Sequence, residues 1–234
     1  MSPEMTAPQH GLPFTIEQFY SVFVQYNETV WPMQIVLYAV AIAILLLLPR
    51  GRPTGSRIIS SLLACLWVWT AVTYYFFFFT RISPSGWLIG AVLLAGGLWL
   101  GWVGGIKSRI QFGLRRDLLG AIGILLVFYS LVAYPLIGLA IGHRYPAIPT
   151  FGLPCPVTIF TVGVLMLATS PVPRSVFVVP ALWGLFGGTS ATFLLGVYQD
   201  AGLLLAGIIS LVALIVVSRP AATPSLGERS SVST

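Results

Sequence analysis

The chain has 234 residues, of which 57% are hydrophobic and only 8% are charged, and its mean hydropathy is +0.93. A water-soluble domain cannot cover that much apolar surface, so the composition excludes an ordinary soluble protein and favours a membrane protein. The net charge of +6 does not indicate nucleic-acid binding, because the basic residues are scattered at the ends of apolar runs. We therefore expect membrane lipid, and no nucleic acid, as a partner.

Residues 1–31 precede the apolar runs and are expected to form an extracytoplasmic segment. Within it, Thr15 has the pattern of a helix N-cap, with Gln18 reaching back to it and Phe14 packing on Phe19. Apolar residues then recur at helical spacing. This pattern predicts an amphipathic helix that lies on the outer membrane surface or packs over the bundle as a lid.

Seven apolar runs follow, most of them near the ~20 residues that cross a bilayer. We expect an all-α, polytopic transmembrane helical bundle of seven spans in one membrane domain, residues 32–218. The fifth run is short, so it begins earlier, is shielded by its neighbours or meets a thinner bilayer, and six spans are the main alternative. The predicted spans are 32–48, 58–79, 85–105, 118–141, 156–170, 175–197 and 201–218.

Charge gives the orientation of the predicted bundle. Of the twelve Lys and Arg residues, only Arg81 and Arg144 fall on the side that also carries the N-terminal segment. The positive-inside rule then places the N-terminus outside and the C-terminus in the cytoplasm. Residues 219–234, rich in Ser, Thr and Pro, are expected to form a disordered cytoplasmic tail.

Two kinds of residue are predicted to set contacts of the spans. Aromatic side chains near the outer ends, Trp31, Trp87 and the Tyr74-Tyr75 pair, are typical of anchors at headgroup level. Small residues at four-residue spacing permit close helix contacts, and we expect them to serve a homo-oligomer or a membrane partner. These glycines are Gly97, Gly101 and Gly105 on the third span and Gly184 and Gly188 on the sixth.

Polar chemistry gathers on the predicted outer side. A proline-rich segment, 142–158, would hold His143 and Cys155 in fixed positions. One hypothesis is a zinc or copper site formed by His143, Cys155 and Asp200, with Glu17 as another acid. The alternative is that His143 binds loop carbonyls or lipid phosphate, Cys155 is a small buried residue and Asp200 caps the last span.

A ligand pocket is a further hypothesis for the same face. If Arg144 pairs with Asp200 beneath the N-terminal helix, the two side chains enclose a partly dry polar pocket. The candidate ligand-binding residues are Glu17, His143, Arg144, Tyr145 and Asp200.

Several enzyme and cofactor classes lack their residues. The only lysine, Lys107, lies in an inner loop, which argues against a retinal protein, and His10 and His143 lie outside the spans, which disfavours a buried bis-histidine haem. No catalytic residue is assigned. Binding of a small molecule or metal ion, linked to transport or sensing, is the leading hypothesis; a partner-binding subunit and an outer-face membrane enzyme are the alternatives.

Four segments resemble a bacterial family of uncharacterised membrane proteins, a domain of unknown function. They are Leu12-Pro13-Phe14-Thr15 with Glu17-Gln18-Phe19, Trp31-Pro32, Gly142-His143-Arg144-Tyr145-Pro146, and Thr150-Phe151-Gly152 with Pro154-Cys155-Pro156. The similarity runs from about residue 12 to residue 218. The resemblance implies a multi-pass protein of the bacterial inner membrane, and it implies no activity, substrate or catalytic residue.

Overall fold

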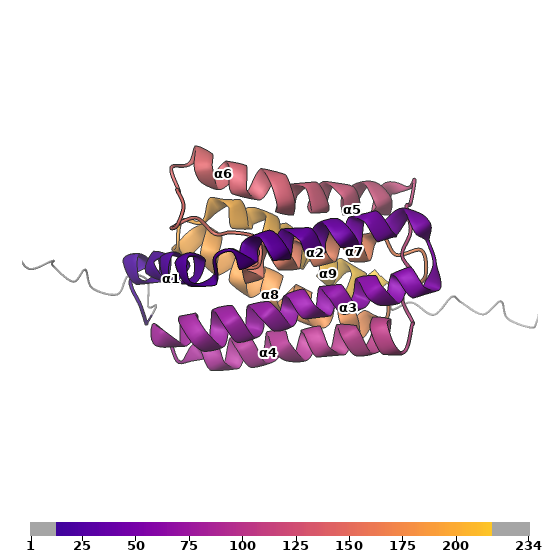
Figure 1. The fold of residues 1–234 in the computed structure, drawn as a ribbon, viewed down its shortest axis with the longest axis horizontal. Coiled ribbons are helices and arrows are strands. Elements are labelled where there is room, and N and C mark those ends of the chain that lie inside the picture. The colour runs from indigo at the N-terminus through magenta and orange to yellow at the C-terminus, as the bar shows by residue number, and fades with distance from the viewer. Residues whose placement is uncertain (1–12, 217–234) are drawn as a thin grey trace, which may run out of the picture.

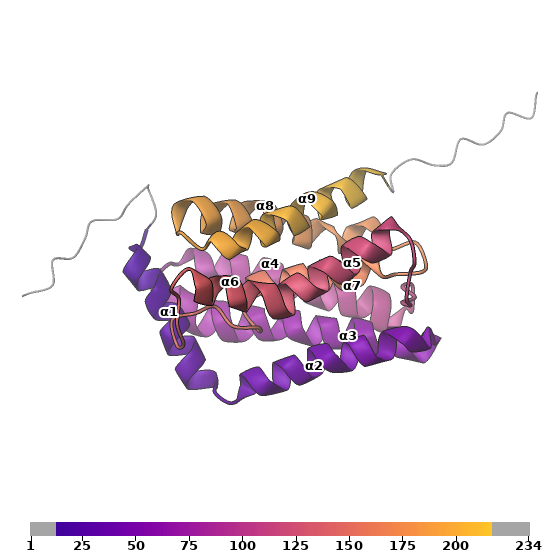
Figure 2. The same cartoon turned by 90° about the horizontal axis from the view of Figure 1, so that it is seen from above.

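The computed structural model describes residues 13–216, so the predicted tail, 219–234, lies outside the described residues. Helix α1 (Ile16–Val30) lies across one end of a bundle whose other helices run roughly parallel to one another (Figures 1 and 2). We call this the α1 end. The opposite end, where the connections 48–52, 107–117 and 167–177 gather, is called the basic end.

The described part of the chain is helical, and four of the long helices continue into π-helical turns. In chain order the bundle consists of α2 (Met33–Leu47), α3 (Pro53–Trp69) with the π segment η2 (Thr70–Phe78), α4 (Ser85–Leu100) with η4 (Gly101–Ile106), α5 (Leu118–Phe128) with η5 (Tyr129–Ala133), α6 (Tyr134–Ala140), α7 (Pro154–Met166), α8 (Val178–Thr189) with η7 (Ser190–Leu194), and α9 (Ala201–Val216). Short 3-10 turns lie between them: η1 (Leu48–Arg50), η3 (Phe79–Arg81), η6 (Arg174–Val176) and η8 (Tyr198–Asp200).

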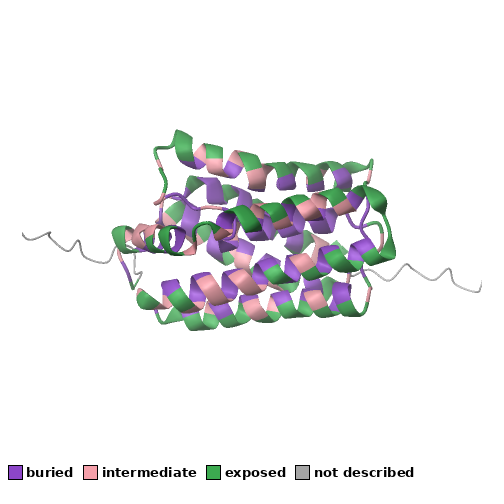
Figure 3. Cartoon of the chain, viewed as in Figure 1, coloured by how far each residue is buried: buried purple, intermediate pink, exposed green. Residues whose placement is uncertain are grey.

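Six of the seven predicted spans correspond to helices that are long and apolar enough to cross a membrane. Exposed residues lie on the outward faces of these helices, and buried residues lie on the faces toward the centre of the bundle (Figure 3). The six helical stretches are Met33–Arg50, Pro53–Arg81, Ser85–Ile106, Leu118–Ala140, Arg174–Leu194 and Tyr198–Val216.

Helix α7 is the short predicted fifth span. Its 13 residues extend about 20 Å, less than the ~30 Å hydrocarbon core of a bilayer. Every residue of α7 except Cys155 is buried, because α3, α5, α8 and α9 pack around it. Of the explanations considered for its length, shielding by neighbours is the one that this packing supports, since irregular backbone at membrane depth is tolerated where protein surrounds it.

Both predicted glycine ladders pack within the chain. A Cβ atom at Gly97 would lie 2.7 Å from the Cβ of Trp67, and one at Gly184 would lie 2.4 Å from the Cα of Gly207. Such distances leave no room for a side chain, so α4 approaches α3, and α8 approaches α9, backbone to backbone. The other ladder members, Gly101, Gly105 and Gly188, face α3 or α9 in the same way.

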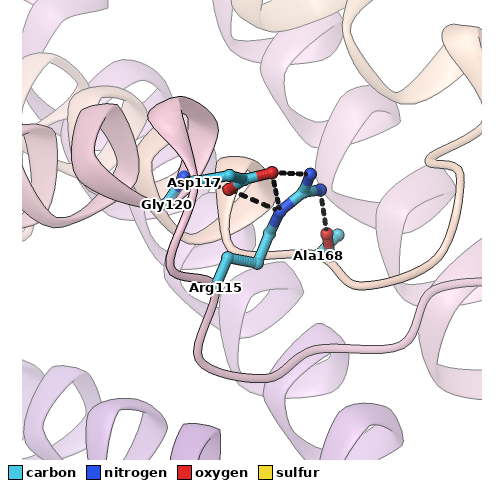
Figure 4. A network of polar contacts seen from close by, with 4 residues as sticks. All are labelled: Arg115, Asp117, Gly120 and Ala168. Carbon is cyan, nitrogen blue, oxygen red and sulfur yellow. Dashed lines mark hydrogen bonds and ion pairs between the residues drawn. The ribbon is translucent and has the colours of Figure 1, made fainter.

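Polar contacts close the basic end. The Asp117 carboxyl group caps α5 by accepting the Gly120 N–H at 3.0 Å, and the Arg115 guanidinium joins Asp117 to the Ala168 carbonyl, 2.7 Å away (Figure 4). The Arg115 guanidinium, together with the Gly120 N–H, lowers the pKa of Asp117 to about 2. This network fastens the start of α5 to the chain that leaves α7.

Backbone pairing adds to that closure. The Thr169 N–H donates to the Gln111 carbonyl at 2.8 Å, and the Arg57 guanidinium donates to the Gly105 carbonyl at 3.0 Å. The loops of the basic end are therefore tied to each other and to the helices, and they satisfy one another's polar groups at the end of the bundle.

At the other end, α1 has the predicted start. Thr15 and Gln18 form a capping box, and the rings of Phe14 and Phe19 are stacked with their centroids 6.1 Å apart. Of the two predicted placements, the structure supports packing over the bundle, because one face of α1 is buried against it. The buried residues are Phe19, Val22, Phe23, Tyr26 and Asn27.

Candidate functional site

A cavity of about 630 Å³ lies at the α1 end, beneath α1 and beside the N-terminus of α7. Its volume falls within the roughly 300–1,000 Å³ that is usual for small-molecule sites. Its roof is formed by Phe19 and Phe23 of α1 and by Phe14, which precedes the helix. Apolar and aromatic side chains from α4, α8 and the π segments η2 and η7 form its walls.

Two π segments shape those walls. The segment η2 supplies Tyr74 and Tyr75, and η7 supplies Ser190 and Ala191. A π turn widens a helix locally and is frequently found at functional sites. Tyr75 also packs edge-on against Trp183 of α8, with ring centroids 5.7 Å apart. The widened turns thus present tyrosine hydroxyls and small side chains to a wall that is otherwise hydrocarbon.

The floor of the cavity carries a buried polar cluster. Asp200, with 2% of its surface exposed, accepts a hydrogen bond of 2.6 Å from the Tyr134 hydroxyl and also interacts with the Cys155 thiol. Tyr74 and Tyr75 lie near enough to both Cys155 and Asp200 to interact with them electrostatically. Cys155 keeps partial exposure because it faces the cavity. We call these five residues the polar cluster.

Asp200 differs from both of its predicted roles. Among the described residues no backbone N–H donates to its carboxyl group, so Asp200 does not cap α9, and its partners are the phenol of Tyr134 and the thiol of Cys155. It does not pair with Arg144, which is exposed on the loop. Buried polar groups require partners, and Tyr134 and Cys155 provide them here.

The predicted loop is held by α1, through residues that sequence analysis did not single out. The Asn27 amide donates to the carbonyls of Pro146 and Ile148, at 2.7 and 2.8 Å, and accepts a hydrogen bond of 2.7 Å from Thr150. The Tyr145 hydroxyl donates to the Asn27 carbonyl at 3.1 Å. Tyr145 therefore fastens the loop to the lid instead of facing the cavity.

His143 contacts the lid as well. Its Nε2 atom lies 3.1 Å from the Tyr20 hydroxyl, and its Nδ1 atom is buried without a hydrogen-bond partner among the described residues. Burial lowers the pKa of His143, and burial together with nearby Asp200 raises the pKa of Tyr20 to about 12. Both groups are thus neutral near pH 7, and they join the loop to α1.

The predicted metal ligands are only partly brought together. Cys155 and Asp200 interact, whereas His143 packs on Tyr20 and Glu17 is exposed in the first turn of α1. Across residues 13–216 no group of three His, Cys, Asp or Glu side chains is placed to hold a metal ion. A zinc or copper site at these residues stays a prediction without structural support.

The expected role of Tyr74 and Tyr75 was wrong. Tyr74 and Tyr75, expected as headgroup anchors, are each only 2% exposed and line the cavity. Trp31 and Trp87, expected in the same role, are 58% and 59% exposed. The run of six aromatic residues from 74 to 79 was the available signal, because a headgroup anchor needs one or two rings at the interface and not a continuous run.

The fold and site define an all-helical bundle with multiple apolar helices of membrane-spanning length and a lidded apolar cavity at one end. Residues 16–224 match the sequence profile of a family described as "Family of unknown function (DUF6064)". Because the match covers most of the chain, the protein belongs to this family. No curated protein and no solved structure matches the chain.

Proposed function

We propose that this protein is a multi-pass protein of the bacterial inner membrane that binds an apolar small molecule in the cavity beneath α1, in the service of transport or sensing. The basic end is assigned to the cytoplasm by the positive-inside rule, because most basic residues lie in its loops, and the cavity then faces the extracytoplasmic side. Seven spans follow if α7 is counted with the six longer helices.

The observation that carries the proposal is the cavity itself. Native interiors are packed to a density that leaves few voids larger than a water molecule, so about 630 Å³ of apolar space is unusual for a purely structural bundle. A largely apolar pocket with a few converging polar groups is the general form of a small-molecule site.

The proposed binding site is therefore the cavity, and not the loop residues that were expected from the sequence. Of the candidate ligand-binding residues, Asp200 stands behind the cavity floor, while His143 and Tyr145 hold the lid and loop in place. Glu17 and Arg144 are exposed at the same end, where they would meet a ligand only outside the lid. We assign ligand contact to the cavity walls and to Cys155.

A partner-binding subunit is less well supported. The glycine faces expected to recruit a second chain are occupied by α3 and α9 of the same chain. The role of an outer-face enzyme has no observation in its favour beyond the polar cluster. We therefore retain one functional proposal, binding in the cavity.

The test is to fill the cavity and ask whether a bound molecule is lost. Ala191, in the cavity wall, is changed to Phe, and Ala91, on the exposed face of α4, is changed to Phe as the matched control. Small molecules retained by the detergent-purified proteins are identified by native mass spectrometry and organic extraction. We expect an apolar molecule with the wild type and Ala91→Phe, and its loss in Ala191→Phe with folding preserved.

Two results would contradict the proposal. One is that the retained molecules are the same in all three proteins. The other is that none of a panel of apolar compounds raises the thermal stability of the wild type more than that of Ala191→Phe.

A further inference from the structure

The cavity reaches the side of the bundle between α4 and α8. Three residues that line it, Leu88 of α4 and Leu182 and Phe186 of α8, are 70%, 59% and 65% exposed. The two helices meet nearer the basic end, where a Cβ at Gly96 would lie 2.9 Å from the Cβ of Val179. The gap between them therefore lies in the half of the bundle near α1, and within a membrane it faces acyl chains and not water.

The roof, by contrast, is closed toward the extracytoplasmic side. The rings of Phe14, Phe19 and Phe23 cover the cavity, and Phe14 packs edge-on against Phe79 with centroids 5.6 Å apart. The loop behind them is fastened to α1 through Asn27. A ligand arriving from water would have to separate these contacts, whereas a ligand arriving from the bilayer meets the exposed side chains of Leu88, Leu182 and Phe186.

The lining also limits the chemistry of the ligand. Among residues 13–216, no Lys, Arg, His, Asp or Glu lines the cavity, so a charged headgroup would lie there without a counter-charge from this part of the chain, which is costly in an apolar medium. The neutral polar groups that line it are few: the thiol of Cys155, the hydroxyls of Ser85 and Ser190, and the side chains of Tyr74, Tyr75 and Trp183. Such a wall suits hydrocarbon that ends in one small, uncharged hydrogen-bonding group.

The volume of the cavity limits the length of the ligand. At about 30 Å³ for a group the size of a water molecule, a cavity of about 630 Å³ holds roughly 20 non-hydrogen atoms. This corresponds to one long hydrocarbon chain with a small head, and a phospholipid with two chains exceeds it.

We propose that the cavity takes a neutral single-chain lipid, of the class of a long-chain alcohol, directly from the bilayer through the gap between α4 and α8. Its polar end lies at the polar cluster, beside Cys155, Tyr74 and Tyr75. This inference rests on the proposed function, since it names the ligand class and the route of the same cavity.

The ligand class is tested with photoreactive lipids in vesicles that contain the full-length protein. A long-chain alcohol bearing a diazirine on its chain is compared with the carboxylate of equal length and with a diazirine-bearing phosphatidylcholine. We expect the alcohol to label the peptide that contains Cys155, which bulk lipid cannot reach because the rest of α7 is buried. Excess unlabelled alcohol should remove this labelling, and the two charged or larger probes should label only outward-facing helices.

Conservative substitutions test where the polar end of the lipid lies. Tyr74→Phe and Tyr75→Phe remove one hydroxyl each, and at about 1 kcal/mol for one hydrogen bond we expect about fivefold weaker competition by the alcohol in at least one of them. Tyr38→Phe is the control, since Tyr38 packs on Phe151 and does not line the cavity. Equal labelling by the carboxylate, or unchanged competition in both cavity variants, would overturn the neutral-lipid assignment.

The route is tested at Cys155 in a Cys65→Ser background, which removes the other cysteine. A long-chain methanethiosulfonate confined to the bilayer is compared with a charged one confined to water. We expect faster modification by the lipid reagent, and slower modification after Leu182→Trp at the gap than after Leu211→Trp on the exposed face of α9. Faster reaction with the charged reagent would overturn the lateral route while leaving the proposed function standing.

Failure of the lateral route can be distinguished from failure of the proposed function. If neither reagent modifies Cys155 in the folded protein, although both modify it after denaturation, the cavity admits no ligand and the proposed function fails together with this inference.

Discussion

The two ends of the bundle use polar groups differently. At the basic end, side chains bond to backbone carbonyls of neighbouring loops, as Arg115 does with Ala168 and Arg57 with Gly105. At the α1 end, Asn27 makes the corresponding hydrogen bonds to the carbonyls of the loop. Tyr134, Cys155 and Asp200 lie further inside the bundle, beside the cavity. The polar groups of the basic end therefore close the loops on one another, whereas those of the α1 end lie beside a cavity, and the α1 end is where a ligand fits.

The largest expected effect breaks the tightly packed end. A Cβ at Gly123 of α5 would lie 2.7 Å from the Gly163 carbonyl oxygen of α7, so Gly123→Leu must push the two helices apart. We expect a loss of about 3 kcal/mol or more in the free energy of unfolding, measured by denaturation in detergent micelles. Ala121→Leu, on the exposed face of the same helix, should change it by less than about 0.5 kcal/mol. Equal stability of the two variants would show that this contact can relax.

The next effect opens the closure of the α1 end. Asn27→Ala deprives two loop carbonyls and Thr150 of their partner in a fully buried position. With about 1–3 kcal/mol for each buried group left unsatisfied, we expect a loss of about 3 kcal/mol and faster hydrogen exchange in residues 145–152. Gln25→Ala, on the exposed face of α1, is the control. Unchanged exchange in the loop would mean that α1 does not hold it.

A smaller effect concerns pH. Because burial lowers the pKa of His143 in the folded protein, the unfolded chain binds the proton more readily. The stability contributed by neutral His143 is fully present above the unfolded pKa, about 6.5, and is lost as pH falls toward the folded value. We expect the thermal midpoint of the wild type to fall between pH 7.5 and 5.5, and His143→Gln to remove most of that dependence. A pH dependence retained in full by His143→Gln would assign it to other groups.

The smallest effect sharpens the contrast between the ends. Ala191→Leu adds three carbon atoms at the cavity wall, where space is available, so we expect stability within about 1 kcal/mol of the wild type. The Gly123→Leu change, which adds four carbon atoms where a Cβ already lies 2.7 Å from the Gly163 carbonyl oxygen, is expected to be severe. A loss at Ala191 as large as that at Gly123 would show that the cavity closes in the absence of ligand.

Much of the helical architecture was predictable, because apolar runs of bilayer length are local properties of the sequence. Seven spans were predicted in this way, and six of them correspond to helices long and apolar enough to cross a membrane. The predicted capping box at Thr15 is confirmed. The shielding of α7 was one of several open explanations, since the composition of 156–170 does not reveal how many neighbours surround it.

The site was less predictable, because it depends on which residues from distant segments meet. His143, Cys155 and Asp200 were selected for their chemistry, and the structure joins only the last two. Tyr134 bonds to Asp200 across 66 positions, and Asn27 bonds to the loop across more than 100, so no local pattern indicates either contact. The cavity itself is a property of packing, and its lining residues look like ordinary span residues in the sequence.

The burial of α7 by its neighbouring helices has a consequence for biosynthesis. A segment inserts into a bilayer alone when its own contact with lipid is favourable, and α7 is both too short and too thoroughly surrounded for that. Helices α8 and α9, which cover part of it, are translated later. The nascent chain must therefore hold α7 at the insertion machinery, or against the helices already made, until α8 and α9 emerge, so that the core is completed only after α9 has been synthesised.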